Sequence, residues 1–172
     1  ATVTLVFSEA VASFSSAADI TVANGALSTM SSADNVTWAG TFTPTADTED
    51  ASNVLSLATS YTDTAGNAGP AETTANYAID TQAPSVNTFT LSDVALKVGE
   101  TATVTLVFSE AVASFSSSAD ITVANGTLAA MTSTDNITWA GTFTPTANTE
   151  DDNNTLSLAT SYTDTAGNAG PA

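Results

Sequence analysis

The sequence contains no cysteine, no histidine and a single basic residue, Lys97. Disulfides, thiolate or imidazole metal ligands, and catalytic Cys-His or Ser-His pairs are therefore excluded. The formal net charge of -17, from 18 acidic residues against one lysine, removes the attraction on which nucleic-acid binding depends. We expect no nucleic acid and no anionic membrane surface as partner, and any metal site must be built from oxygen atoms.

Long apolar runs are also lacking. No stretch approaches the roughly 20 apolar residues that cross a bilayer, and the first residues lack the basic-then-apolar profile of a signal peptide. Yet 42% of the 172 residues are apolar, enough for a core in one large or two modest domains. We expect a globular chain without membrane insertion, cut from a longer protein.

The chain repeats itself at an offset of 101 residues. Residues 1–71 align with residues 102–172 without insertion or deletion, and about 60 of the 71 positions are identical. Such similarity is typical of a tandem array rather than of two specialised domains. We expect two units, 1–80 and 81–172, joined around residues 80–84. By this division the first unit lacks its first strand and the second its last.

Each unit has the pattern of several short strands. Val104, Leu106 and Phe108 alternate with threonines, and Trp139 and Phe143 alternate with small residues, the period of a half-buried strand. The other strands are expected at 85–91 with a kinked continuation through 94–98, at 121–123, 128–131 and 156–162, and at 75–79 in the first unit. Asn125-Gly126 predicts a two-residue hairpin.

About seven such strands per unit, with no helical period, predict an all-β, immunoglobulin-like antiparallel β-sandwich. A β-solenoid would show a period near 20 residues, and none is present. Trp38 and Trp139 lie on alternating strands, which favours a place in the core over a carbohydrate-binding platform. The abundant threonine reflects β-propensity rather than a flat ice-binding array.

In an antiparallel sandwich, the linker and three of the loops meet at one end of a unit. In the second unit these segments carry four carboxylates and one amide, namely Asp80, Glu110, Asp135, Asp164 and Asn168. The equivalent set in the first unit lacks a linker aspartate and consists of Glu9, Asp34, Asp63 and Asn67. An acidic loop at the opposite end of the first unit adds Asp47, Glu49 and Asp50.

Carboxylates gathered in this way repel one another unless a cation joins them. Ca²⁺ takes six to eight oxygen ligands in irregular geometry, and the motif Asp-Thr-Ala-Gly-Asn supplies a carboxylate, a turn glycine and an amide. Calcium is therefore the predicted cofactor, bound more weakly in the first unit. The alternative for each aspartate is a turn cap that bonds backbone N–H groups. For Asp47, Glu49 and Asp50 a solvated acidic loop is the favoured interpretation.

Three motifs occur in the order Phe-Ser-Glu-Ala (7–10 and 108–111), Ser-Tyr-Thr-Asp-Thr-Ala-Gly-Asn (60–67 and 161–168) and Ile-Asp-Thr-Gln-Ala-Pro (79–84). Together they resemble the bacterial immunoglobulin-like extender repeats of giant type I secreted adhesins of the repeats-in-toxin class, including ice-binding and biofilm adhesins. The resemblance implies sandwiches joined end to end, calcium ligands at Asp80, Glu110 and Asp164 and at Glu9 and Asp63, and an extracellular location on a bacterial surface.

We therefore expect a structural spacer stiffened by calcium, whose partners are neighbouring repeats of the same chain and which has no small-molecule substrate and no catalytic residues. The alternative function is a ligand- or carbohydrate-binding module. A glycosidase would also need paired carboxylates, but no cleft or aromatic subsite is evident. An intramolecular isopeptide bond would need a buried lysine in each unit, and Lys97 is alone.

Overall fold

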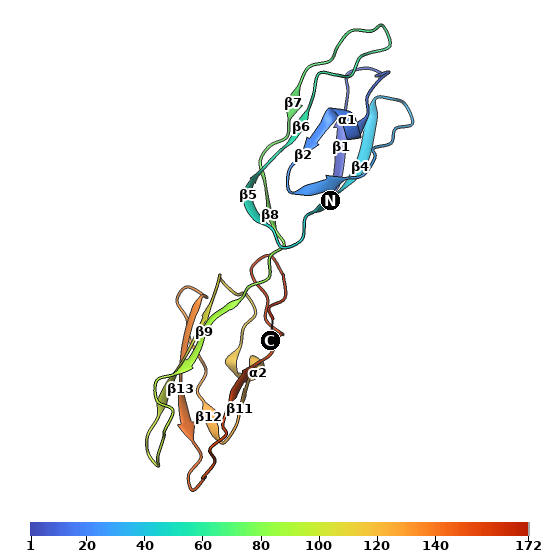
Figure 1. Ribbon diagram of the computed structural model, residues 1–172. Helices are drawn as coiled ribbons and strands as arrows, with labels where there is room; N and C mark the ends of the chain where they lie inside the picture. Colours follow the sequence, from blue (N-terminus) through green and yellow to red (C-terminus); the bar gives the residue numbers. More distant parts are fainter. Residues whose placement is uncertain (172) are drawn as a thin grey trace. The chain divides into compact units, whose positions relative to one another are not determined.

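The computed structural model describes residues 1–171 and divides into two compact units, 1–82 and 83–172 (Figure 1). Ala172, the last residue of the second predicted unit, lies outside the described residues. We call the two units the first and the second repeat. In the described residues the strands pair antiparallel and the helices are single short turns, so the all-β prediction is confirmed.

The first repeat has eight strands and one helical turn. These elements are β1 (Thr2–Val6), α1 (Ser16–Asp19), β2 (Ile20–Val22), β3 (Gly25–Leu27), β4 (Thr37–Pro44), β5 (Glu49–Asn53), β6 (Leu55–Leu57), β7 (Glu72–Thr73) and β8 (Tyr77–Asp80). One sheet has the order β1-β4-β3, another has the order β2-β6-β7, and β5 pairs with β8 (Figure 1).

The second repeat follows the same plan from its own first strand. Its elements are β9 (Val86–Leu91), β10 (Ala102–Phe108), α2 (Ser117–Asp120), β11 (Ile121–Val123), β12 (Gly126–Leu128), β13 (Thr138–Pro145) and β14 (Leu156–Leu158). The sheets have the orders β12-β13-β10-β9 and β11-β14.

The core of each repeat lies between its sheets, as expected for a sandwich. In the second repeat Val104, Leu106 and Phe108 of β10 are at most 1% exposed. They pack with Ile121 of β11 and with Leu158 of β14 on the opposite sheet. The face of β10 that the alternating pattern predicts to be buried is therefore the face that packs in the core.

The two tryptophans belong to these cores. The Trp139 ring lies 4.9 Å from that of Phe115, and the Trp38 ring lies 4.9 Å from that of Phe14, centroid to centroid. Both indoles pack against buried clusters rather than standing on an open face. The core interpretation is confirmed, and the tryptophans form no sugar-binding platform.

Several sequence-based predictions about strands are wrong. The strand expected at 128–131 lies at Gly126–Leu128, and the one expected at 156–162 ends at Leu158. β9 ends at Leu91, and residues 92–100 form no strand, because the Asp93 carboxylate accepts a hydrogen bond from the Ala95 N–H (2.9 Å) and Gly99 has a left-handed φ of 89°. Val94 is consequently 91% exposed. Asn125 has the predicted left-handed φ of 50°, but the turn that it opens joins two different sheets and is no hairpin.

The helical turns α1 and α2 were not predicted. In α2 the buried Asp120 carboxylate accepts hydrogen bonds from the Ser116 N–H (2.7 Å) and from the Ser161 hydroxyl. These bonds tie the turn to the loop after β14. Ser116 makes no side-chain cap, so the Asp120 carboxylate holds this turn, and a periodic pattern does not reveal such a contact.

Lys97 forms an ion pair with Glu100, with 3.1 Å between Nζ and Oε1, and its side chain is 81% exposed. An isopeptide bond requires a lysine enclosed in the core. The exposed position of Lys97 therefore gives the covalent hypothesis no support.

Candidate metal centre

The loop Asp-Thr-Ala-Gly-Asn of the second repeat is folded around the Asp164 carboxylate. Its Oδ1 accepts hydrogen bonds from the backbone N–H groups of Gly167 (2.6 Å) and Asn168 (2.8 Å). Its Oδ2 accepts one from the Asn168 side-chain amide (2.7 Å). Gly167 has a φ of 99°, a conformation that glycine adopts without strain.

Tyr162 fixes this loop to the core. Its ring is fully buried against Phe108, with the centroids 4.9 Å apart, and its hydroxyl donates to the Pro171 carbonyl (2.8 Å). Burial, with the charge of Asp120 nearby, raises the pKa of the Tyr162 hydroxyl, which keeps it a donor. A side chain on Gly170 would overlap the ring, so the closure requires glycine there.

The loop after β10 is joined directly to this motif. Val112 and Asp164 form an antiparallel bridge, and the Ala113 N–H donates to the Thr163 carbonyl (2.8 Å). Glu110 lies only two residues before the bridge. Two segments more than fifty residues apart in the sequence are thus held side by side.

The linker reaches the same end of the second repeat. Pro84 is buried, the Ser85 N–H donates to the Ser109 hydroxyl (2.8 Å), and the Ser109 N–H donates to the Ser85 carbonyl (2.8 Å). Asp80, which opens the linker, accepts from the Gln82 N–H (3.3 Å). The linker is therefore anchored beside Glu110.

Three carboxylates meet at this end. One oxygen from each of Asp80, Glu110 and Asp164 lies within 4.8 Å of the other two. Asp164 is 1% exposed, and the other two side chains are half-buried. Among residues 1–171 no other group of three or more acidic residues comes together in this way. We call these three residues the carboxylate cluster.

Hydrogen bonds keep Asp164 ionised inside the cluster. Burial opposes its charge, but the bonds from the Asn168 side chain and from the backbone of Asn168 and Gly167 outweigh burial and hold the pKa of Asp164 below 3.8, its ordinary value. An ionised Asp164 therefore lies within 4.8 Å of two further acidic side chains.

The donor set fits a hard cation. Calcium binds oxygen at about 2.3–2.6 Å, so two ligands on opposite sides of one ion are separated by about 4.6–5.2 Å. The three oxygen atoms, which lie within 4.8 Å of one another, are therefore close enough to bind one such ion. A turn cap alone explains the bonds of Asp164, but it does not explain why Asp80 and Glu110 lie against it.

Asp135 does not belong to the cluster, although its loop lies at the same end of the repeat. Its Oδ1 accepts hydrogen bonds from the Ser133 hydroxyl (2.9 Å) and from the backbone N–H groups of Ile137 (2.9 Å) and Thr138 (2.8 Å). The expected convergence of four carboxylates thus includes only three. Asp34 makes the same bonds in the first repeat.

These turn caps predict a loss of stability in acid. Bonds from the backbone N–H groups of Thr138 and Ile137 lower the pKa of Asp135 below 3.8, and the same contacts lower that of Asp34. A carboxyl whose pKa is lower in the folded state stabilises the fold above about pH 4, and this contribution is lost as the pH falls through the folded pKa. Melts in EDTA from pH 6 to pH 2 should show a smaller acid-induced fall for the D34N/D135N variant than for the unsubstituted protein. Equal acid-induced falls in melting temperature for the two proteins would contradict the role of Asp34 and Asp135 as ionised turn caps.

Asn168 supports Asp164, because its amide nitrogen donates to Oδ2. The first repeat contains the same loop, in which Asp63 accepts from Ala65 N–H, Asn67 N–H and the Asn67 amide at 2.7–2.8 Å. The side-chain bond from Asn67 is the main cause that lowers the pKa of Asp63. Glu9 is exposed, and neither acid belongs to a group of three.

The acidic loop of the first repeat has internal contacts. Asp50 accepts from the Asn24 amide (2.7 Å) and from the Ser52 N–H (2.8 Å), and Glu49 stands opposite Asp80 in the β5–β8 pair. Asp47 adopts a left-handed φ of 52° in the turn before β5. Within the described residues these three acids form no group that could hold a metal ion. Asp50 instead stabilises its own loop through its hydrogen bonds.

Antiparallel sheets packed around a buried core, repeated in tandem with acidic loops at one end, define a class of β-sandwich modules. The model of the bacterial Ig-like domain matches residues 1–79 and again residues 80–172. The chain therefore belongs to the bacterial Ig-like domain family, and its fold is the immunoglobulin-like sandwich. By these boundaries Asp80 opens the second domain. Comparisons with curated proteins and with solved structures give no match.

Bacterial Ig-like domains are typically non-catalytic, surface-exposed modules of bacterial proteins. Among residues 1–171 no helix is long and apolar enough to cross a membrane.

Proposed function

We propose that this chain is a spacer of a bacterial cell-surface adhesin, in which calcium bound at and near the linkers stiffens the array of repeats. The carboxylate cluster carries the proposal, because one oxygen from each of three acidic side chains, from the linker and two distant loops, lies within 4.8 Å of the other two. The proposed ligands are Asp80, Glu110 and Asp164, with Asn168 holding Asp164 in place.

The position of Asp80 gives calcium a mechanical role. Asp80 is the last residue of β8 and opens the linker, whereas Glu110 and Asp164 belong to loops of the second repeat. An ion shared by the three would restrict the rotation of the linker, which its peptide bonds alone do not prevent. Near-identity of the repeats supports a spacer over a ligand-binding module, whose loops would be expected to diverge.

The energy of each site is modest. Extracellular calcium modules bind with Kd of about 10⁻⁴–10⁻³ M. At a calcium concentration tenfold above Kd, one site adds about 1.4 kcal/mol to the folded state. Summed over many repeats, such increments stabilise a long extended structure.

Chelation tests the proposal. We expect excess EDTA to lower the melting temperature and to reduce the maximum dimension measured by small-angle X-ray scattering, and millimolar calcium to restore both. Magnesium at the same concentration serves as the control, because it demands a smaller octahedral site. Identical melting temperatures and scattering curves with calcium and with EDTA would contradict the proposal.

A further inference from the structure

Both repeats carry the tripeptide Asn-X-Thr at the same tight turn. It reads Asn-Val-Thr at residues 35–37 and Asn-Ile-Thr at residues 136–138, at the offset of 101. This tripeptide is the acceptor sequence, or sequon, of N-linked glycosylation, in which the middle residue is anything except proline. The middle residue differs between the repeats, and both versions satisfy the rule.

The backbone of this turn has a fixed shape. In the second repeat the Val112 N–H donates to the Asn136 carbonyl (3.0 Å), and the Asn136 N–H donates to the Ser133 hydroxyl (2.8 Å). Asn136 has a left-handed φ of 59°, which asparagine adopts more often than most residues. Asn35 has the same φ, and its carbonyl accepts from the Val11 N–H (3.0 Å). The main chain of the turn is therefore anchored in both repeats.

The side chains of the sequon are exposed and unengaged. Asn35 and Asn136 are exposed, and within residues 1–171 neither side chain makes a hydrogen bond. The sequon also requires the hydroxyls of Thr37 and Thr138. Both threonines are exposed, and in the same range of residues neither hydroxyl makes a hydrogen bond. A sugar attached to either asparagine would therefore break no contact of the fold.

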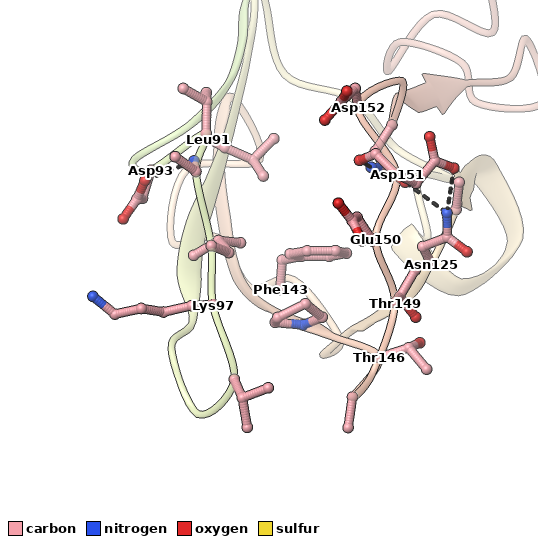
Figure 2. Close-up of a pocket in the computed structure, with 18 of the residues that line it drawn as sticks. Leu91, Asp93, Lys97, Asn125, Phe143, Thr146, Thr149, Glu150, Asp151 and Asp152 are labelled. Atoms are coloured by element: carbon pink, nitrogen blue, oxygen red, sulfur yellow. Dashed lines mark hydrogen bonds between the residues drawn. The ribbon is translucent and has the colours of Figure 1, made fainter.

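A third asparagine has the same pattern but an occupied amide. Residues 125–127 read Asn-Gly-Thr, and the Asn125 amide donates to Asp151 Oδ2 and to Asn154 Oδ1, both at 2.8 Å (Figure 2). A nitrogen that carries a sugar keeps a single N–H, so glycosylation of Asn125 would remove one of these two bonds. The first repeat has no sequon here, because Ala26 takes the place of the threonine.

We propose that Asn35 and Asn136 are N-glycosylation sites, modified by a transferase that uses a nucleotide-activated hexose. A C–N bond forms between carbon 1 of the sugar and the side-chain nitrogen of the asparagine. The C–O bond from that carbon to the nucleoside diphosphate breaks, the diphosphate leaves with the bonding electrons, and one amide proton passes to water. The modification is independent of calcium, because neither asparagine belongs to the carboxylate cluster.

Glycans at these turns would place one bulky, hydrated group on each repeat, at intervals of 101 residues. Exposed loop tips are where proteases cut most readily. A sugar at the turn would shield the neighbouring backbone from them.

The pattern also occurs at residues 153–155, in the second repeat only, because Ser52 is the first-repeat counterpart of Asn153. Three consecutive acidic residues, 150–152, precede it. A nucleotide-activated sugar is itself an anion, and like charges repel it from this loop. We expect Asn153 to be a poorer acceptor than Asn136.

Peptide mapping by mass spectrometry, on the protein purified from the bacterium that produces it, tests the proposal. Peptides that contain Asn35 or Asn136 are expected to carry the mass of one or more hexoses. Peptides that contain Asn125 are expected to carry none, because its amide is engaged in the fold.

Two variants of the second repeat, produced in the same bacterium, serve as controls. T138V keeps Asn136 but removes the hydroxyl of the sequon, so the sugar at Asn136 should be lost while that at Asn35 remains. T138S keeps a hydroxyl and should retain both sugars. Melting curves check that both variants fold, as expected for an exposed side chain whose hydroxyl makes no hydrogen bond within residues 1–171.

Unmodified Asn35 and Asn136 in the protein from that bacterium would overturn the proposal. A sugar at Asn136 that survives the T138V substitution would do the same, since the sequon would then not be what the transferase recognises. Modification of Asn153 alone would place the site on another loop. Equal occupancy of Asn125 would show that an unengaged amide does not select the site.

Discussion

The L106A substitution is expected to destabilise the second repeat by about 3–4 kcal/mol, the usual cost of deleting a fully buried leucine side chain. Leu106 is 0% exposed, and β10 holds it between Phe89 of β9 and Trp139 of β13. β10 is paired on both sides, with β9 and with β13, so we expect little backbone movement into the space. Urea unfolding followed by tryptophan fluorescence measures the change.

The repeat supplies a matched control. Leu5 has the same sequence neighbours, but it is half-buried, and β1 is paired on one side only. We expect L5A to cost about half as much, since less apolar surface is lost. A W38F background reports the second repeat through Trp139, and a W139F background reports the first through Trp38. Equal costs for L106A and L5A would show that β9 adds nothing to the core.

The D164N substitution is expected to cost more stability in calcium than in EDTA. In EDTA the variant should lose some stability, because both carboxylate oxygens accept hydrogen bonds and the substituted amide has only one oxygen to accept them. In millimolar calcium the loss should be larger, with calcium affinity reduced at least about tenfold, beyond the effect of losing an outer hydrogen-bond partner. Calcium titrations followed by thermal melting give both quantities.

Asp63 provides the comparison for this result. Like Asp164, it accepts hydrogen bonds from the backbone N–H and the side-chain amide of the asparagine four residues on, but it belongs to no carboxylate cluster. D63N should therefore change the calcium response less than D164N does. If both variants were destabilised equally with and without calcium, Asp164 would be a turn cap and nothing more.

The sequence was sufficient to predict the sandwich because its strongest signals are local and periodic. The alternation of Val104, Leu106 and Phe108 is the pattern of one buried face, and the structure buries that face. Alternation alone was misleading at Val94, Leu96 and Val98, where an aspartate-capped turn and a left-handed glycine interrupt the strand. Turn chemistry outweighs periodicity in so short a segment.

Pairing between strands was harder to predict than the strands themselves. Asn125-Gly126 has the composition of a hairpin turn, but β11 pairs with β14 and β12 pairs with β13. The same limit applies to the site. Strand direction was sufficient to group Asp80, Glu110 and Asp164, whereas the hydrogen bonds that occupy Asp135 depend on local geometry that no spacing reveals.

The near-identity of the repeats has a consequence for kinetic partitioning during folding. β1 and β10 are followed by the same residues, and β4 and β13 share the sequence Thr-Trp-Ala-Gly-Thr-Phe-Thr-Pro, so side-chain contacts cannot tell a correct pair from a crossed one. Leu5 finds Trp38 33 positions away, whereas the crossed partner Trp139 is 134 positions away. This fourfold longer loop costs only about 1.2 kcal/mol more to close. Synthesis from the N-terminus, which lets the first repeat close before the second exists, therefore protects the array from strand exchange more than its contacts do.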